Sequence, residues 1–176
     1  MADAARFEAF VREFEDMVYA TAVRLVGNPS DAEDVAQTVF LRAFERFASL
    51  EHQPAAPGWL KTVTTNLCLN HLTRYRARWQ FFSELESGSG AVPGFIDRLT
   101  AAAAVVPDDE HSEAERLERA LQGLPDHQRV PLVLFHFEDR SYQEIADLLG
   151  VSLGKVKTDI HRGRDALKRV LGERTR

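Results

Sequence analysis

The sequence predicts an all-α fold with two small helical domains joined by a flexible linker. Apolar residues recur at helical spacing through most of the 176-residue chain, and no convincing alternation of apolar and polar residues indicates a strand. Residues 83–109 interrupt this pattern with Gly, Ser and Pro, and they are too many for an ordinary connection inside one domain. We therefore expect one domain over 1–82 and another over 110–176.

Two helices are expected at the start of the chain. The first runs from about Ala4 to Val26 and ends at the Gly-Asn-Pro sequence that follows. The second begins at Ser30, because Glu33 lies three residues later at the spacing of a capping box, and it continues to about Ala48. Its predicted apolar positions are Val35, Val39, Phe40, Ala43, Phe44 and Phe47.

A loop and a third helix complete the first domain. Residues 50–57 contain two prolines and are predicted to form the loop. The third helix is expected from Trp59 to about Gln80. Its apolar positions are Leu60, Val63, Leu67 and Leu72.

After the linker, helices are predicted over 110–121 and 125–137, followed by a helix-turn-helix. In the latter motif, Ser141 and Glu144 have capping-box spacing, Gly150 supplies the turn and Ser152 caps the second helix. Ile145, Ala146, Leu148 and Leu149 form the apolar face of the first helix, and Val156, Ile160 and Leu167 form that of the second. The side chains expected to point outward, as in a helix that reads the major groove, are Lys155, Lys157, Thr158, His161 and Arg162. The alternative is a two-helix piece of an ordinary bundle with a solvated charged face.

Charge is distributed unevenly along the chain. The net charge is −5, yet residues 59–82 carry four basic and no acidic residues, and residues 141–176 carry eight basic against five acidic ones. Between them, residues 83–120 carry nine acidic against three basic residues. A DNA-binding protein draws most of its affinity from neutralising phosphates. A chain with this balance is therefore expected to need a partner to hold DNA firmly.

The sequence does not favour an enzyme, a metal protein or a membrane protein. It contains a single cysteine, Cys68, which we expect to be buried packing, and its six histidines are scattered. We find no nucleophile–base set, no phosphate-binding glycine loop and no apolar run of membrane length, so no cofactor or metal is expected. The first residues lack the basic start and apolar block of a signal peptide, which predicts a cytoplasmic protein without membrane insertion.

Two segments together resemble the extracytoplasmic-function (ECF) family of bacterial RNA polymerase sigma factors. DAEDVAQTVFLRAFERF, residues 31–47, followed by PGWLKTVTTNLCLNHLTRYR, residues 57–76, is similar to the promoter-melting domain of that family. The C-terminal residues 121–171 are similar to the domain that reads the −35 element. Many regulators share the C-terminal pattern alone. The two segments together, in this order and at this separation, are specific for the ECF family.

The resemblance implies that residues 31–47 dock on the β′ clamp helices of core RNA polymerase. The positions that match the family's docking surface are Asp31, Asp34, Gln37, Thr38, Phe40 and Arg42. The competing interpretation assigns no docking role to these residues: Phe40 would be a core residue, and the acidic residues would only cap the helix. This chain also departs from the family, since Thr38 stands where Glu is frequent.

The third helix is implied to contact and open the −10 element. Opening requires bases to leave the stack, which aromatic and basic side chains stabilise. The candidate residues are Trp59, Lys61, Thr64, Thr65, Asn66, Asn70, Arg74 and Arg78. The preceding loop matches the segment that holds a flipped-out base in the family. Trp59 is equally compatible with a core position, and Asn70 stands where the family often has an acidic residue.

The helix-turn-helix is implied to read the −35 element. The matching positions are Arg140, Ser141, Ser152, Lys155, Lys157, Thr158, His161 and Arg162. Most of these are expected to contact phosphate and so to position the protein rather than specify bases. Asp159 is a departure, because the family usually has Arg there; its carboxylate is expected either to weaken phosphate contact or to pair with a neighbouring cation.

The resemblance further implies three partners: core RNA polymerase, through its clamp helices and β flap; promoter DNA; and an anti-sigma factor or other regulator. Two other functional classes make different predictions. A stand-alone helix-turn-helix regulator predicts a dimer that binds palindromic DNA without polymerase. A small helical enzyme would need the catalytic groups that we do not find.

Overall fold

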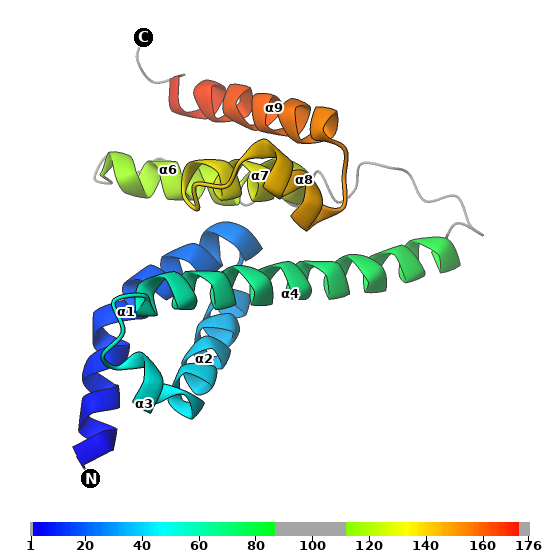
Figure 1. The fold of residues 1–176 in the computed structure, drawn as a ribbon. Coiled ribbons are helices and arrows are strands. Elements are labelled where there is room, and N and C mark those ends of the chain that lie inside the picture. Colours follow the sequence, from blue (N-terminus) through cyan, green and yellow to red (C-terminus); the bar gives the residue numbers. More distant parts are fainter. Residues whose placement is uncertain (1, 87–111, 173–176) are drawn as a thin grey trace. The chain divides into compact units, whose positions relative to one another are not determined.

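The computed structural model describes residues 2–86 and 112–172, with side chains placed for residues 4–73 and 112–172. All regular elements in these ranges are α-helices, which confirms the predicted fold class. The chain divides into two compact units, residues 1–78 and 79–176 (Figure 1). Each unit is described separately below.

The first helix, α1 (Ala2–Val26), agrees with the prediction at its C-terminal end. It stops where Gly27 adopts a left-handed backbone conformation, with φ of 74°, which costs glycine little. Val18, Ala22 and Leu25 are buried along one side of α1, and this helix packs against α2.

The second helix, α2 (Pro29–Glu45), begins earlier than the predicted capping box. Asn28 is the N-cap: its Oδ1 accepts hydrogen bonds from the backbone N–H groups of Ser30 at 2.9 Å and Asp31 at 3.3 Å. Pro29 then occupies the first helical position, where its missing N–H has no helical partner to lose. The capping box at Ser30 is therefore wrong, because Asn28 followed by proline starts the helix before Ser30 is reached.

The predicted end of the second helix is also wrong. The N–H of Arg46 donates to the carbonyl of Ala43 at 3.1 Å, which tightens the last turn and ends α2. A short helix, α3 (Phe47–Leu50), follows, and both of its end residues are buried. Phe47 packs edge-on against Phe7, with ring centroids 5.1 Å apart. Phe47 and Leu50 therefore extend the core beyond the end of α2.

The helix α4 (Ala56–Glu86) is longer than predicted at both ends. Pro57 lies in its first turn, where proline is tolerated, so the connecting loop shortens to residues 51–55. Its buried residues include Leu60, Cys68 and Leu72. Residues 83–86 belong to this helix, and residues 87–111 lie outside the described part of the chain.

The second unit contains α6 (Glu113–Gln122), α7 (Asp126–His136), α8 (Tyr142–Leu149) and α9 (Leu153–Gly172). The N-cap Ser112 exchanges hydrogen bonds with Glu115, so α6 begins three residues after the predicted 110. Pro125 is the N-cap of α7. Helix α9 packs against α6, α7 and α8, which makes it the central element of this unit.

A buried arginine fixes the corner between α6 and α7. The Arg129 guanidinium donates to the carbonyl of Leu124 at 2.8 Å and to the carboxylate of Asp126 at 2.5 Å. Its side chain is almost fully covered. These hydrogen bonds stabilise a charge that would otherwise be costly to bury.

Candidate functional site

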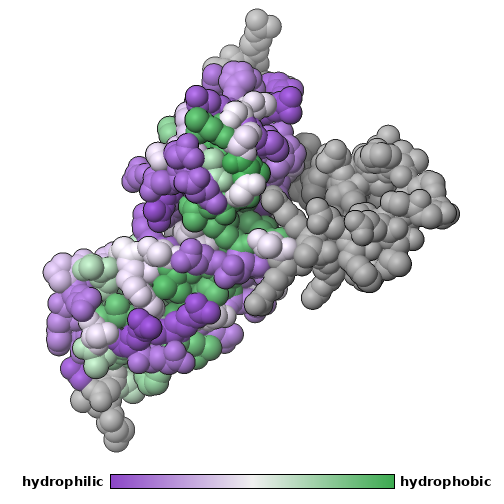
Figure 2. All heavy atoms as spheres, turned by 45° about the vertical axis from the view of Figure 1, so that its right-hand side comes forward, coloured by the Kyte–Doolittle hydropathy of each residue, from purple (hydrophilic) through white to green (hydrophobic). Residues whose placement is uncertain are grey.

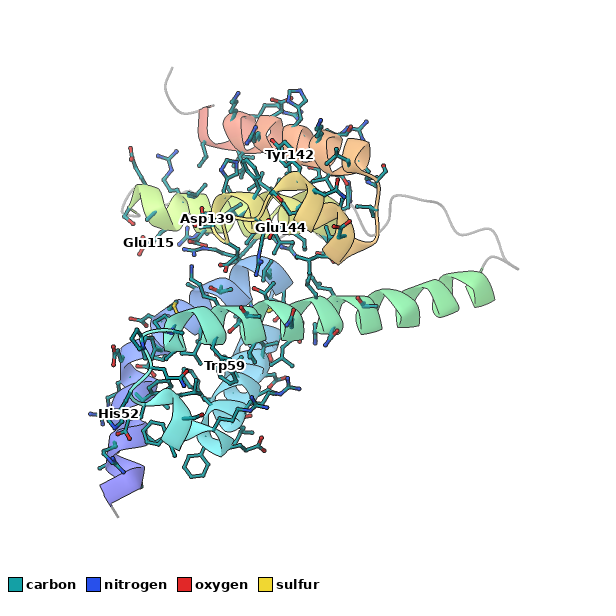
Figure 3. The ribbon with its side chains drawn as sticks, in the orientation of Figure 1. His52, Trp59, Glu115, Asp139, Tyr142 and Glu144 are labelled. Atoms are coloured by element: carbon teal, nitrogen blue, oxygen red, sulfur yellow. The ribbon has the colours of Figure 1, made fainter. Side chains whose placement is uncertain are left out.

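The helix-turn-helix begins at the predicted capping box (Figure 3). The Ser141 N–H donates to Glu144 Oε2 at 2.8 Å, and Ser141 Oγ accepts from the Glu144 N–H at 3.3 Å. The backbone N–H and the hydroxyl of Ser141 both donate to Glu144 Oε2 at 2.8 Å, and they hold the pKa of the Glu144 carboxyl below its usual value, with the backbone N–H contributing most. At the other end of α8, Gly150 has φ of 63° and makes the turn, as predicted.

The buried face of this motif differs from the prediction at one position. Ile145 and Ala146 of α8 and Val156 and Ile160 of α9 are buried, as expected. Leu148, which was predicted to face inward, is exposed. At ~100° per residue it lies ~160° around the helix from Ala146, so the packing that covers Ala146 leaves it in solvent.

The predicted outward face of α9 is exposed. Its exposed members are Lys155, Lys157, Thr158, His161 and Arg162. Two of them pair with acidic residues one helical turn further on: Lys155 Nζ lies 2.6 Å from Asp159 Oδ2, and His161 Nε2 lies 3.2 Å from Asp165 Oδ2. The structure thus confirms one of our two expectations for Asp159, pairing with a neighbouring cation.

The remaining candidates around the turn also serve the fold. Arg140 Nη1 lies 3.5 Å from Glu144 Oε1, and Ser141 is the N-cap described above. Ser152 Oγ accepts from the backbone N–H of Lys155 at 3.2 Å, which matches its predicted capping role. All three residues lie at the N-terminal ends of α8 and α9. Any contact that they make with DNA must leave these intramolecular contacts in place.

The exposed face of α2 forms a stripe with a polar and an apolar end. Asp34, Gln37, Leu41 and Phe44 follow one another at intervals of three or four residues, and all four are exposed. Leu41 is 62% and Phe44 57% exposed, although Phe44 also packs edge-on against Phe7. We call these four residues the α2 stripe.

The α2 stripe includes two apolar residues that were not among the predicted docking residues. Phe44, one of the predicted apolar positions of this helix, and Leu41 are exposed, whereas Phe40, the expected apolar anchor, is half-buried. The buried side of α2 consists of Ala32, Val35, Val39 and Ala43. Leu41 lies opposite this side, so a helical wheel drawn around these four residues would have found it. Figure 2 shows hydrophobic patches among hydrophilic side chains on one face of the molecule.

Other predicted docking residues have contacts within the first unit. Asp31 Oδ2 lies 3.3 Å from His71 Nε2, which joins the start of α2 to α4. Thr38 Oγ1 donates to the carbonyl of Asp34 at 2.9 Å. Arg42 is exposed in the last turn of α2.

A second stripe runs along α4, with Trp59 in its first turn (Figure 3). Asn66 and Asn70 are exposed and Trp59 is half-buried, and their spacing places all three on one side of the helix. Thr62 and Thr73, which the sequence reasoning did not single out, are exposed on the same side. We call these five residues the α4 stripe.

Burial removes two of the predicted DNA-contacting residues from this surface. Thr64 and Thr65 are buried, and Thr64 Oγ1 donates to the carbonyl of Leu60 at 2.7 Å. They lie on the side of α4 that carries Leu60 and Cys68, so in this structure DNA cannot reach them. Lys61 is half-buried, and the side chains of Arg74 and Arg78 lie outside the described residues.

The described part of the chain shows neither a membrane span nor a metal-binding cluster. No helix among them combines the length and the apolar character that a membrane span requires. Within the same residues, no group of three His, Cys, Asp or Glu side chains is arranged to hold a metal ion. Cys68 is a buried free thiol.

Both stripes and the helix-turn-helix fall within segments that match known families. Residues 10–78 match the family described as sigma-70 region 2, and residues 114–167 match sigma-70 region 4. The chain is 30% identical over 172 residues to the ECF RNA polymerase sigma factor SigW of Bacillus subtilis, covering 96% of this chain and 90% of that protein.

The chain belongs to the ECF family of RNA polymerase sigma factors. It is also 37% identical over 170 residues to the ECF sigma factor SigE of Mycolicibacterium smegmatis, and it spans 62% of the length of that relative. The RNA polymerase sigma-E factor of Streptomyces coelicolor is 31% identical over 171 residues, covering 97% of this chain and 89% of that protein.

A solved structure shares the fold of this sigma factor. It is the sigma factor RpoE of Bartonella quintana, in complex with the anti-sigma factor NepR. The TM-score is 0.53 at 22% identity, with 96% of this chain and 98% of that chain covered.

Proposed function

We propose that this chain is an alternative sigma factor that binds core RNA polymerase, directs it to promoters with −10 and −35 elements, and nucleates strand opening. The observation that carries the proposal is the presence of two separate helical units, each with an exposed surface suited to one part of that task. The polymerase performs the chemistry, so the chain itself is not an enzyme. It acts in the cytoplasm, where the polymerase and the DNA are.

The α2 stripe is the proposed surface for the β′ clamp helices. Stable interfaces concentrate their energy in a few apolar anchors surrounded by polar groups that set orientation. Leu41 and Phe44 are exposed apolar anchors, and Asp34 and Gln37 supply the polar end. Asp31 has a smaller share, because its carboxylate already lies beside His71.

The α4 stripe is the proposed surface for the −10 element. The indole of Trp59 offers a stacking surface for an unpaired base, and such stacking contributes ~1–3 kcal/mol per base. Asn66 and Asn70 carry amides that both donate and accept, so they suit the edges of bases that have left the duplex. Thr64 and Thr65 are not part of this proposal, because they are buried.

The exposed face of α9 is the proposed reader of the −35 element, and the same unit is proposed to contact the β flap. Lys157, Thr158, His161 and Arg162 are available for phosphates and base edges. A net charge of −5 disfavours tight binding of DNA by the chain alone. Two weak contacts held in register by the polymerase gain affinity through effective concentration.

A regulatory partner is also proposed. The structural neighbour was solved with an anti-sigma factor bound. A regulator that covers the exposed apolar side chains of Leu41 and Phe44 competes with the polymerase for the α2 stripe. An anti-sigma factor of this kind fits the family and the surface.

Run-off transcription tests the proposal. Purified core polymerase is supplied with a genomic promoter library, with and without the full chain. Promoter-specific transcripts are expected only when the chain is present. Trp59→Ala should reduce strand opening, followed by permanganate reactivity of the −10 thymines, whereas Thr64→Val should not. A chain that ignores polymerase and binds palindromic duplex tightly as a dimer would instead be a stand-alone regulator.

A further inference from the structure

The helix proposed to read DNA, α9, carries a buried carboxylate, that of Asp159, which forms an ion pair with Lys155. Lys155 Nζ donates to Asp159 Oδ2 at 2.6 Å. The Asp159 side chain is only 7% exposed, whereas that of Lys155 is 51% exposed. The Asp159 carboxylate is therefore buried, and the exposed Lys155 side chain covers it at the edge of the proposed DNA-reading surface.

The two partners differ in their freedom to move. Removing the cation from a buried carboxylate leaves an uncompensated charge, which is strongly unfavourable. A DNA phosphate that captured Lys155 would have to offset that cost, whereas a phosphate that contacts a cation without an acidic partner would not. Among the described residues, no acidic side chain lies within ion-pair distance of Lys157 or Arg162.

We infer that Asp159 is a positioning residue that withholds Lys155 from DNA, so that phosphate contact along α9 depends on Lys157 and Arg162. This inference rests on the proposed function of α9. Withholding Lys155 lowers the affinity for DNA that does not depend on base sequence, because each phosphate contact adds a similar amount of salt-dependent binding free energy. Promoter binding then depends more strongly on base contacts and on the polymerase.

The test is the salt dependence of promoter binding by the holoenzyme. Core polymerase and the full chain are assembled on a promoter fragment that supports run-off transcription, with core polymerase alone as background. Asp159→Asn should tighten binding and steepen the slope of log K against log [salt] by about 0.9, which is one additional phosphate contact. This corresponds to an additional loss of about 3.5-fold in affinity from 50 to 200 mM KCl.

Two further variants make the assignment specific. Lys155→Met alone should leave the slope unchanged, and adding it to Asp159→Asn should return the steeper slope to the starting value. The matched control is Asp147→Asn, which removes the same charge from an exposed position on α8 where the carboxylate accepts from Gln143. The slope for this control should match that of the unaltered chain.

The outcomes separate the inference from the proposed function. If Asp159→Asn leaves the slope unchanged, or if Lys155→Met alone lowers it by about 0.9, Lys155 is not withheld and the inference is wrong. Should Asp159→Asn fail to fold, Lys155→Met still tests the inference, because a slope lowered by about 0.9 would overturn it. If the unaltered chain directs no promoter complex at all, the proposed function fails before the variants are compared.

Discussion

Gly163 of α9 lies directly against Leu132 of α7. A Cβ placed on Gly163 would come 2.9 Å from Leu132 Cδ1 and 3.4 Å from the carbonyl oxygen of Gln128. Both Gly163 and Leu132 are buried. The absence of a side chain at this position therefore sets how closely the proposed DNA-reading helix approaches α7.

Substituting this glycine tests the close contact. Gly163→Val should destabilise the second unit by ~1–3 kcal/mol, since overpacking forces side chains or backbone to shift. Gly154→Ala is the matched control in the same helix, where a Cβ meets nothing within 4 Å, and it should stabilise by ~0.4–1 kcal/mol. Native-state hydrogen exchange of amides in this unit measures both changes. Equal effects for the two variants would show that the contact does not matter.

The capping box at Ser141 should contribute to both stability and DNA binding. Ser141→Ala removes the hydroxyl that accepts from the Glu144 N–H and should cost ~1 kcal/mol. Ser112→Ala removes the corresponding hydroxyl at α6 and should cost a similar amount. Under the proposed function, only the Ser141 variant weakens promoter binding further. If both variants lower binding equally, Ser141 acts through stability alone.

His136 should make the second unit sensitive to mild acid. Arg164 Nε donates to His136 Nε2 at 3.1 Å, so this nitrogen must be unprotonated. Partial burial, and then the positive charge of Arg164, hold the pKa of His136 below its ordinary value of 6.5. The unfolded chain then gains a proton at higher pH than the folded chain, so stability is full above about pH 6.5 and falls as the pH drops below it.

Replacing this histidine tests the pH effect. His136→Gln should remove the part of the stability loss that occurs below about pH 6.5, because glutamine does not titrate there. His127→Gln, at an exposed position of the same helix, should leave that loss in place. Hydrogen exchange at a series of pH values, corrected for intrinsic rates, provides the comparison. An unchanged profile for His136→Gln contradicts the assignment.

Leu41 of the α2 stripe separates binding from folding. Because its side chain is 62% exposed, Leu41→Ala should change stability by no more than ~0.5 kcal/mol. Under the proposed function, it should weaken core-polymerase binding by ~1–2 kcal/mol, about 5- to 30-fold, as loss of an apolar anchor does. Val170→Ala removes an equally exposed apolar side chain outside the stripe and serves as the control. Equal polymerase affinity for both variants would show that the α2 stripe is not the polymerase-binding surface.

Features that depend on neighbouring residues could be predicted from the sequence. The Ser141–Glu144 capping box and the left-handed Gly150 depend only on residues within one turn of each other, so their spacing was sufficient. The same reasoning was wrong at Ser30, where two start signals compete. Asn28 followed by proline begins the helix earlier than the Ser30–Glu33 spacing indicates.

The sequence by itself determined the helical class, the helix-turn-helix and the family resemblance, because these depend on periodicity and short motifs. Only the tertiary structure decided which face of each helix is covered. It buried Thr64, exposed Leu41 and buried the carboxylate of Asp159 beneath the Lys155 ammonium. Burial depends on helices that are distant in sequence, and for that reason spacing along one helix cannot reveal which polar groups remain available to a partner.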